Sequence, residues 1–203
     1  MPLMPQVTEL IIAELLYLQY ESATDPIFMY INSTGVAKDM NRLGNEVEAF
    51  AIYDTMAYVK APVSTLAIGN AWGESAMLLA AGAPGLRGAL PSASIMLRQP
   101  VQRFDQMQAS DVDIYRRGLR KTGREVVRLL AKHTKHTEAQ LERDIRRPRY
   151  FSPYEAVEYH IIDRVLEPND EAYRAVIRGA RGGEDYREPP KISTKKPKKN
   201  QGH

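Results

Sequence analysis

The chain has 203 residues, of which 43% are hydrophobic, so it can form one domain with a sizeable core. It has no cysteine, which excludes disulfides, a thiol nucleophile and a cysteine-ligated zinc site. The net charge of +3 comes from five lysines after Glu188, because residues 1–188 sum to −2 (23 basic minus 25 acidic). The slightly negative charge of residues 1–188 argues against a general nucleic-acid-binding surface on this part of the chain.

The first third of the chain alternates helical and strand patterns. Apolar residues at helical spacing predict an amphipathic helix over residues 6–20, and PIFMYIN at 26–32 predicts a buried strand. The apolar stretch at 10–18 is interrupted by Glu14 and is far shorter than the roughly 20 residues of a membrane span. We therefore expect no membrane partner, and no signal peptide is visible. Residues 36–45 are polar without clear periodicity, which indicates a loop.

The middle of the chain continues the alternation. Helical spacing over residues 46–59 is followed by a predicted strand, PVSTLAIG, at 62–69. SAMLLAAG at 75–82 predicts a helix that ends at its glycine, and SIMLRQP at 94–100 predicts a short strand. A long helix is predicted over 109–133, although its two glycines each weaken it by about 1 kcal/mol relative to alanine.

The last segments complete an α/β pattern. Capping boxes beginning at Thr137 and Ser152 predict two short helices, the first over 138–146, and IIDRVL at 161–166 predicts a last strand. Strands that alternate with helices predict an α/β body with crossover connections.

A change of composition near residue 168 predicts two parts. Residues 1–167 form the expected folded domain, and the Gly-, Pro- and Lys-rich extension over 168–203 is expected to be mostly flexible. The terminal KKPKK run is interpreted as a solvated linker, with an acidic partner or nucleic acid as the alternative.

Two glycine-containing turns are candidates for chemistry. INSTG at 31–35 follows a predicted strand, so its backbone N–H groups could face a ligand, or it could be a plain turn. GNAWGESA at 69–76 has the small residues of the sharp elbow on which many hydrolases carry a nucleophile. Close packing of a helix on a strand requires the same small residues. The residue at the elbow is Gly73, which has no side chain.

The titratable residues predict no metal site and no cofactor. His133 and His136 have a spacing that can hold a metal, but neither a cysteine nor an acid pair completes the site. We interpret them as solvated histidines at a helix end. Asp111 and Asp113 point in roughly opposite directions on a helix, so they form no paired-carboxylate site.

Taken in order, these segments resemble the ClpP family of serine peptidases over residues 3–167. YINSTG is similar to the family's Tyr-Ile-Asn-Ser-Pro-Gly-Gly segment, and residues 51–71 resemble the helix and strand that precede its nucleophile. Residues 78–100 resemble the run that ends in Met-Ile-His-Gln-Pro. The resemblance implies a ClpP/crotonase-like fold of stacked βαβ units with a projecting handle helix. It also implies that the family's axial N-terminal loop and first strand are missing from this chain.

The resemblance places three vacated catalytic positions. The family's serine falls on Gly73, its histidine on Arg98 in MLRQP, and its aspartate on Pro148 in RRPRYFS. Glycine offers no nucleophile, arginine cannot act as a base near neutral pH, and proline has no side-chain acceptor to orient an imidazole. Ser75 is not expected to substitute, because it lies about 200° around a helix from residue 73.

The same resemblance implies a degenerate oxyanion hole and a contact between rings. The degenerate hole comprises Gly35, Val36 and Glu74, whose carboxylate would oppose a developing negative charge unless it points away. The ring-contact candidates are Gln99, Arg146 and Arg147. A position that is commonly acidic in the family is here basic, so two such copies would repel each other, and we expect pairing with a different subunit.

These substitutions, with the polar insertion within 36–45, resemble the ClpR branch of the family, which lacks the triad and is associated with cyanobacteria and plastids. The implied function is a catalytically inactive structural subunit of an ATP-dependent Clp protease core with two mixed, seven-membered rings. The implied partners are ClpP-type catalytic subunits, other ClpR subunits, an AAA+ Clp unfoldase and unfolded substrate proteins.

The implied location is the chloroplast stroma, with the cyanobacterial cytoplasm as the alternative. Two other hypotheses about function stay open. One is a crotonase-like acyl-CoA enzyme with Glu74 as its acid. The other is a nucleic-acid-binding protein that acts through the lysine tail, with steeply salt-dependent binding.

Overall fold

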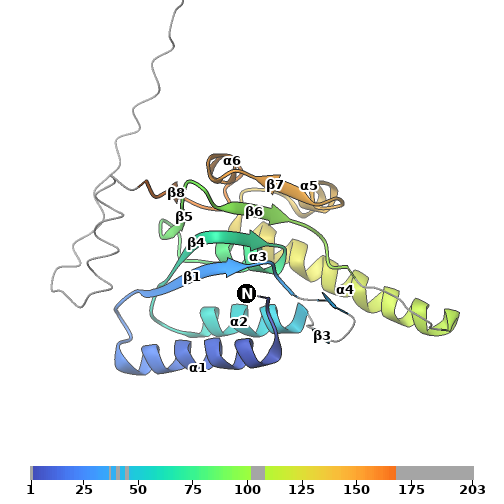
Figure 1. The fold of residues 1–203 in the computed structure, drawn as a ribbon, viewed down its shortest axis with the longest axis horizontal. Coiled ribbons are helices and arrows are strands. Elements are labelled where there is room, and N and C mark those ends of the chain that lie inside the picture. The colour runs from blue at the N-terminus through green and yellow to red at the C-terminus, as the bar shows by residue number, and fades with distance from the viewer. Residues whose placement is uncertain (1, 37, 40–41, 44–45, 102–107, 168–203) are drawn as a thin grey trace, which may run out of the picture. The chain divides into compact units, whose positions relative to one another are not determined.

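A computed structural model describes residues 2–36, 38–39, 42–43, 46–101 and 108–167 of the chain (Figure 1). The helices and strands given below lie within the compact unit Met1–Val165. The predicted extension at 168–203 lies outside the described residues. Within the described ranges, no helix is both long enough and apolar enough to cross a bilayer.

A six-stranded sheet forms the centre of this unit, in the order β7-β6-β4-β5-β8 with β1 beside β4. The strands are β1 (Ile27–Ser33), β4 (Val63–Trp72), β5 (Arg87–Ala89), β6 (Ser94–Leu97), β7 (Arg149–Phe151) and β8 (Arg164–Val165). Only β7 runs antiparallel to its neighbour. The first five residues of β4 are all buried, as expected for a central strand covered on both faces.

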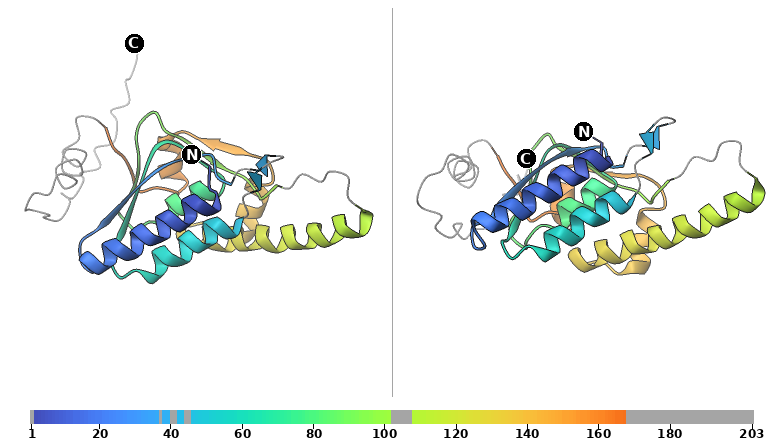
Figure 2. Two further views of the ribbon diagram at one scale, coloured as in Figure 1. Left: turned by 60° about the horizontal axis from the view of Figure 1, so that its bottom comes forward. Right: turned by 90° about the horizontal axis from the view of Figure 1, so that it is seen from below.

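Six helices in the described ranges lie around the sheet. They are α1 (Pro5–Glu21), α2 (Glu46–Tyr58), α3 (Glu74–Ala80), α4 (Ala109–His133), α5 (Glu138–Asp144) and α6 (Pro153–Glu158). Helices α1 and α2 lie side by side on one face of the sheet (Figures 1 and 2). Every residue of α3 is buried, because this short helix packs against the sheet, α2 and α4.

A partly buried ion pair fixes the edge of the sheet. Arg87 Nη2 lies 2.6 Å from Asp163 Oδ1, and the same carboxylate accepts the backbone N–H of Gly85. Arg87 Nη1 also donates to the carbonyls of Ala80 and His133, 3.1 and 2.9 Å away. One guanidinium therefore ties β5 to the ends of α3 and α4 and to the segment before β8.

Helix α4 is packed along only part of its length. Its buried residues, Val126, Val127, Leu129 and Leu130, all lie in its C-terminal half. The N-terminal half extends beyond the sheet and the other helices of the unit (Figures 1 and 2). The structure thus contains a projecting helix at the residues where the sequence predicts one.

Several predictions of single elements require correction. The expected loop at 36–45 contains a short antiparallel pair, β2 (Lys38–Asp39) with β3 (Arg42–Leu43). Strand β4 continues three residues past the predicted end at 69, because residues 70–72 pair with β6. The three-residue strands β5 and β7 were not predicted, since elements this short show no periodicity.

Candidate functional site

A sharp strand-to-helix turn forms the centre of the candidate site. β4 ends at Trp72 and α3 begins at Glu74, so Gly73 alone makes the connection. Gly73 has φ 60° and ψ −118°, a conformation that costs glycine little and strains other residues, and its N–H donates to the carbonyl of Met96 at 2.7 Å. This is the strained elbow geometry that exposes a nucleophile above the sheet in hydrolases.

Arg98 occupies the space beside this elbow. A Cβ atom at residue 73 would lie 2.9 Å from Arg98 Nε and 3.5 Å from Arg98 Nη2. Arg98 Nε is buried and has no hydrogen-bond partner among the described residues. The positions that the resemblance assigns to the serine and the histidine are therefore neighbours. The first is a glycine without a side chain, and the second carries a guanidinium.

The Glu74 carboxylate lies against the backbone of the INSTG turn. Glu74 is 3% exposed, and its Oε2 accepts the backbone N–H of Val36 at 3.1 Å. Arg98 Nη2 lies 3.8 Å from the same oxygen, so a positive charge faces the buried negative one. The carboxylate thus points at the N–H group and not away from it.

Gly35 allows this approach. Its φ is 81°, and a Cβ atom there would lie 2.5 Å from Glu74 Oε2 and 2.6 Å from the carbonyl oxygen of Trp72. Any side chain would collide with both atoms. The two turns that the sequence singles out, at 31–35 and 69–76, therefore meet at the carboxylate of Glu74.

Pro148 lies just beyond the end of the pairing between β6 and β7. β6 and β7 pair up to Leu97 and Arg149, and Arg98 and Pro148 are the next residues on the two strands. Pro148 is exposed. Its assignment as the vacated aspartate position remains a prediction.

Ser75 is shielded from any substrate. It is 1% exposed, and its Oγ is buried without a hydrogen-bond partner in the part of the chain that the structure describes. This burial supports the expectation that Ser75 does not replace the missing nucleophile.

The ring-contact candidates lie together beside β6. Gln99 Nε2 donates to the carbonyl of Arg146 at 2.9 Å, and Arg146 and Arg147 are exposed. Sequence analysis overlooked the neighbouring arginines of α4, Arg116, Arg120 and Arg124, which line one groove with Gln99. Their spacing of four residues was the available signal.

The interpretation of the histidines as solvated is wrong. His133 is partly buried, and its Nε2 lies 2.8 Å from the hydroxyl of Tyr53. Burial lowers the pKa of His133, and the positive charges of Lys132 and Arg87 lower it further. His136 stacks on Tyr159 with ring centroids 4.0 Å apart. In the described ranges, no group of three His, Asp or Glu side chains could hold a metal ion.

The mainly parallel sheet, the buried α3 and the elbow at Gly73 define an α/β protein built on a hydrolase-type framework. The sequence profile of Clp protease matches residues 2–169, and the chain belongs to the Clp protease family. The resemblance to ClpP and the predicted fold class are thereby confirmed.

Named relatives come from plants and cyanobacteria. The "ATP-dependent Clp protease proteolytic subunit-related protein 4, chloroplastic" of Arabidopsis thaliana is 57% identical over 166 residues, which cover 82% of this chain and 54% of the relative. A "putative ATP-dependent Clp protease proteolytic subunit-like" protein of Synechococcus elongatus is 47% identical over 79% of this chain and 71% of its own. The chain thus spans about half the length of the Arabidopsis relative.

A third relative is named as a proteolytic subunit. "ATP-dependent Clp protease proteolytic subunit 2" of Gloeobacter violaceus is 46% identical over 83% of this chain and 74% of its own length. The similarity therefore extends to proteins named as proteolytic subunits and to proteins named as related or like them.

Proposed function

We propose that this chain is a catalytically inactive structural subunit of a hetero-oligomeric, ATP-dependent Clp protease core. The observation that carries the proposal is the contact at the elbow. Residue 73 is a glycine, and the place of a nucleophilic side chain is bordered at 2.9 Å by Arg98 Nε. Without a nucleophile or a neutral base beside it, the covalent step of a serine peptidase has no starting group.

The second support comes from the oxyanion side of the site. An oxyanion hole works by presenting free N–H groups to the developing negative charge. Here the Val36 N–H is bound to Glu74 Oε2, a negative charge of the chain itself. The crotonase-like alternative requires Glu74 as a free acid, and this carboxylate is buried and engaged.

In this proposal the subunit contributes to ring assembly and to the wall of the proteolytic chamber. ClpP-type subunits cut the substrate, other ClpR subunits share the heptameric rings, and an AAA+ Clp unfoldase delivers unfolded proteins. The words "subunit-related" and "subunit-like" in the names of two relatives agree with a non-catalytic member. The chloroplastic relatives favour the chloroplast stroma, with the cyanobacterial cytoplasm as the alternative.

The charge beside β6 supports pairing with a different subunit. Gln99 holds the carbonyl of Arg146, and Arg146 and Arg147 present two exposed cations. If these residues face the opposite ring, two identical copies repel, whereas a ring with acids there is complementary. Arg146→Glu is expected to increase self-association, measured by sedimentation velocity. Unchanged self-association would count against this part of the proposal.

The test is native purification of the endogenous complex, with mass spectrometry of its subunits and fluorophosphonate labelling of each. We expect this chain to copurify with ClpP-type subunits that take up the label, while it stays unlabelled. Labelling of the purified chain alone, or its isolation without any Clp subunit, would refute the proposal. Binding of acyl-CoA by the isolated chain would favour the crotonase-like alternative. Salt-sensitive binding of nucleic acid that is lost on deletion of residues 189–203 would favour the nucleic-acid-binding alternative.

A further inference from the structure

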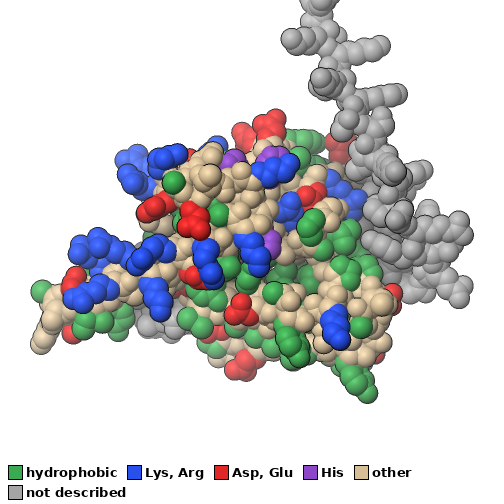
Figure 3. All heavy atoms as spheres, turned by 180° about the vertical axis from the view of Figure 1, so that it is seen from behind, with side chains coloured by type: hydrophobic (Ala, Val, Ile, Leu, Met, Phe, Trp, Pro, Cys, Tyr) green, Lys and Arg blue, Asp and Glu red, His purple; other side chains and the backbone are tan. Residues whose placement is uncertain are grey.

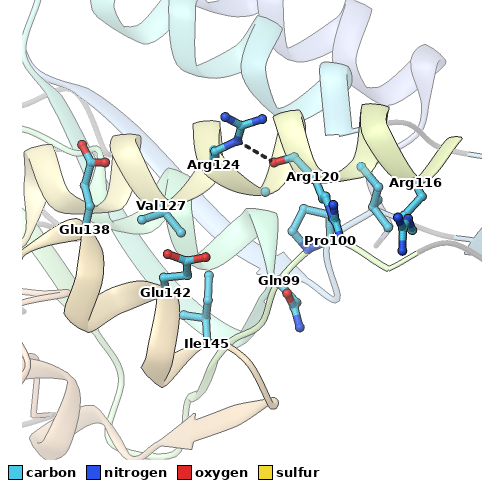
Figure 4. A pocket seen from close by; sticks show the side chains of 11 residues that line it. Gln99, Pro100, Arg116, Arg120, Arg124, Val127, Glu138, Glu142 and Ile145 are labelled. Carbon is cyan, nitrogen blue, oxygen red and sulfur yellow. Dashed lines mark hydrogen bonds between the residues drawn. The ribbon is translucent and has the colours of Figure 1, made fainter. Parts of the chain in front are cut away.

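A groove of about 280 Å³ lies between α4 and α5, beside Gln99 and Pro100 (Figure 4). Its floor is apolar, because Val127, Ile145 and Pro100 line it and are buried by the rest of the unit. The groove is therefore a hollow in which apolar side chains of a ligand can be taken out of water.

Charged side chains of both signs stand along this groove. The unpaired ones are Arg120 and Arg124 of α4 and Glu138 and Glu142 of α5, and all four are exposed. Within the described residues, none of the four forms an ion pair, either with one another or with another group. Figure 4 shows the glutamates toward one end and Arg120 toward the other, and Figure 3 shows acidic side chains close to the basic ones of the projecting helix. The groove thus has a cationic and an anionic end.

Gly123 leaves the groove open. It lies inside α4, where glycine is destabilising relative to alanine. Packing does not require it, because a Cβ atom at residue 123 would lie 3.8 Å from Pro100 Cδ, an ordinary contact. Since Pro100 also lines the groove, a side chain at position 123 would point toward it and fill part of the hollow. Space for a ligand explains a glycine that packing does not.

We infer that this groove binds a short peptide with free termini. Its terminal carboxylate pairs with Arg120 and Arg124, since arginine binds carboxylates through strong, charge-assisted hydrogen bonds. Its terminal ammonium pairs with Glu138 and Glu142, and its side chains lie on the apolar floor. A ligand that carries only one sign of charge would meet a like charge at one end of the groove.

The length of the groove selects a peptide over a free amino acid. In an amino acid the two charges are adjacent, whereas here they belong to different ends of the groove. The lining residues of α4 run from Arg116 to Val127, about 16 Å along the helix axis. At about 3.4 Å per residue, an extended peptide of about four residues covers most of this length.

The source of such a ligand rests on the proposed function, because a Clp protease core produces short peptides with two free termini. The binding itself does not depend on that function. It is measured on the full chain without any other Clp subunit, so its failure leaves the composition and labelling of the native complex untouched as evidence.

The first test compares four forms of one tetrapeptide, Ala-Val-Leu-Ala, by isothermal titration calorimetry. The forms have free termini, an acetylated N-terminus, an amidated C-terminus, or both blocks. At about 0.05 M salt, the free peptide should bind about tenfold more tightly than either singly blocked form, and about 0.5 M salt should reduce this difference. Equal affinity for all four forms, or no binding of the free peptide, would overturn the inference.

The second test assigns each terminus to its wall by double-mutant cycles. R120Q/R124Q should bind the free and the amidated peptide alike but still prefer a free N-terminus to an acetylated one. E138Q/E142Q should show the reverse pattern. If both variants discriminate among the four peptides as wild type does, these side chains do not hold the termini and the inference is wrong.

The third test fills the groove without changing its charge. Gly123→Leu should weaken binding of the free peptide about tenfold while it makes α4 more stable, because leucine is a better helix former than glycine. Gly118→Leu is the matched control, since it makes the same change in the same helix at a residue that does not line the groove and has nothing within 4 Å of its Cβ position. Equal affinity of the two variants would contradict a ligand in the groove.

Discussion

A side chain at position 73 would displace Arg98: Arg98 Nε lies 2.9 Å from the point where a Cβ atom of residue 73 would stand. In a serine peptidase, the corresponding pair is joined by the hydrogen bond through which the base takes the proton of the nucleophile. Here the arginine fits because the glycine leaves room for it. The two residues are thus physically linked: a side chain at position 73 requires Arg98 to move or to change, whereas a change of Arg98 alone creates no clash.

Gly73→Ser is expected to destabilise the fold and to give no activity. The new Cβ meets Arg98, and the φ of 60° strains any non-glycine residue. The free energy of unfolding, measured in urea, should therefore fall by about 1–3 kcal/mol. Gly85→Ser is the control, because Gly85 has a φ of 85° but nothing within 4 Å of its Cβ position. The added Arg98→Ala should restore part of the stability of Gly73→Ser. If Arg98→Ala restores none of it, the contact is not the cause.

The Glu74 carboxylate is expected to block a rebuilt active site. In a chain carrying Gly73→Ser, Arg98→His and Pro148→Asp, adding Glu74→Met should raise the rate of fluorophosphonate labelling about 100-fold. The reason is that the Val36 N–H is released from Glu74 Oε2. Glu74→Gln is the control, since its amide oxygen still accepts this N–H and the site should stay slow. Equal rates for all three residues at position 74 would show that the carboxylate does not matter.

The sequence predicts long elements well and short ones poorly. The bounds predicted for the long helix, 109–133, are those of α4, because its amphipathic pattern extends over 25 residues. β5 and β7 have three residues each, too few for any period. β4 extends to Trp72 because β6 supplies pairing partners, which the sequence of 70–72 alone does not reveal.

For the candidate site, the motif order identified the residues and not their contacts. Gly73, Arg98 and Glu74 could be assigned from the order of short motifs. The direction of the Glu74 carboxylate could not, because it depends on the φ of 81° at Gly35, which opens the space for it. The groove lined by Arg116, Arg120 and Arg124 was missed because its walls come from α4 and α5, which sequence patterns treat separately.

The Arg87–Asp163 ion pair is expected to stabilise the fold above about pH 4. Burial raises the pKa of Asp163, but the hydrogen bonds and charge of Arg87 and the Gly85 N–H outweigh this, so the pKa is lowered. Its contribution is therefore present above the unfolded pKa of about 3.9 and is lost as the pH falls through the folded value.

Asp163→Asn should lower the free energy of unfolding at pH 7 by about 2 kcal/mol, less than for a fully buried pair because Asp163 is partly exposed. It should also reduce the loss of stability in acid. Asp113→Asn removes an exposed pair on α4 and should cost below about 0.5 kcal/mol. Urea unfolding at several pH values measures both. Similar costs for the two variants would contradict the assigned role of Arg87.

His133 is expected to make the fold less stable as the pH falls below about 6.5. Burial is the main cause of its lowered pKa, so the folded state holds the ring neutral while the unfolded chain takes up a proton. Between about pH 7.5 and pH 5.5, wild type should lose about 1 kcal/mol that His133→Gln does not lose. Tyr53→Phe removes the hydroxyl at 2.8 Å but leaves the ring buried, so it should lower stability by about 1 kcal/mol and keep the pH dependence. A pH dependence in His133→Gln equal to that of wild type would assign the effect to other groups, because only the buried imidazole is missing from that variant.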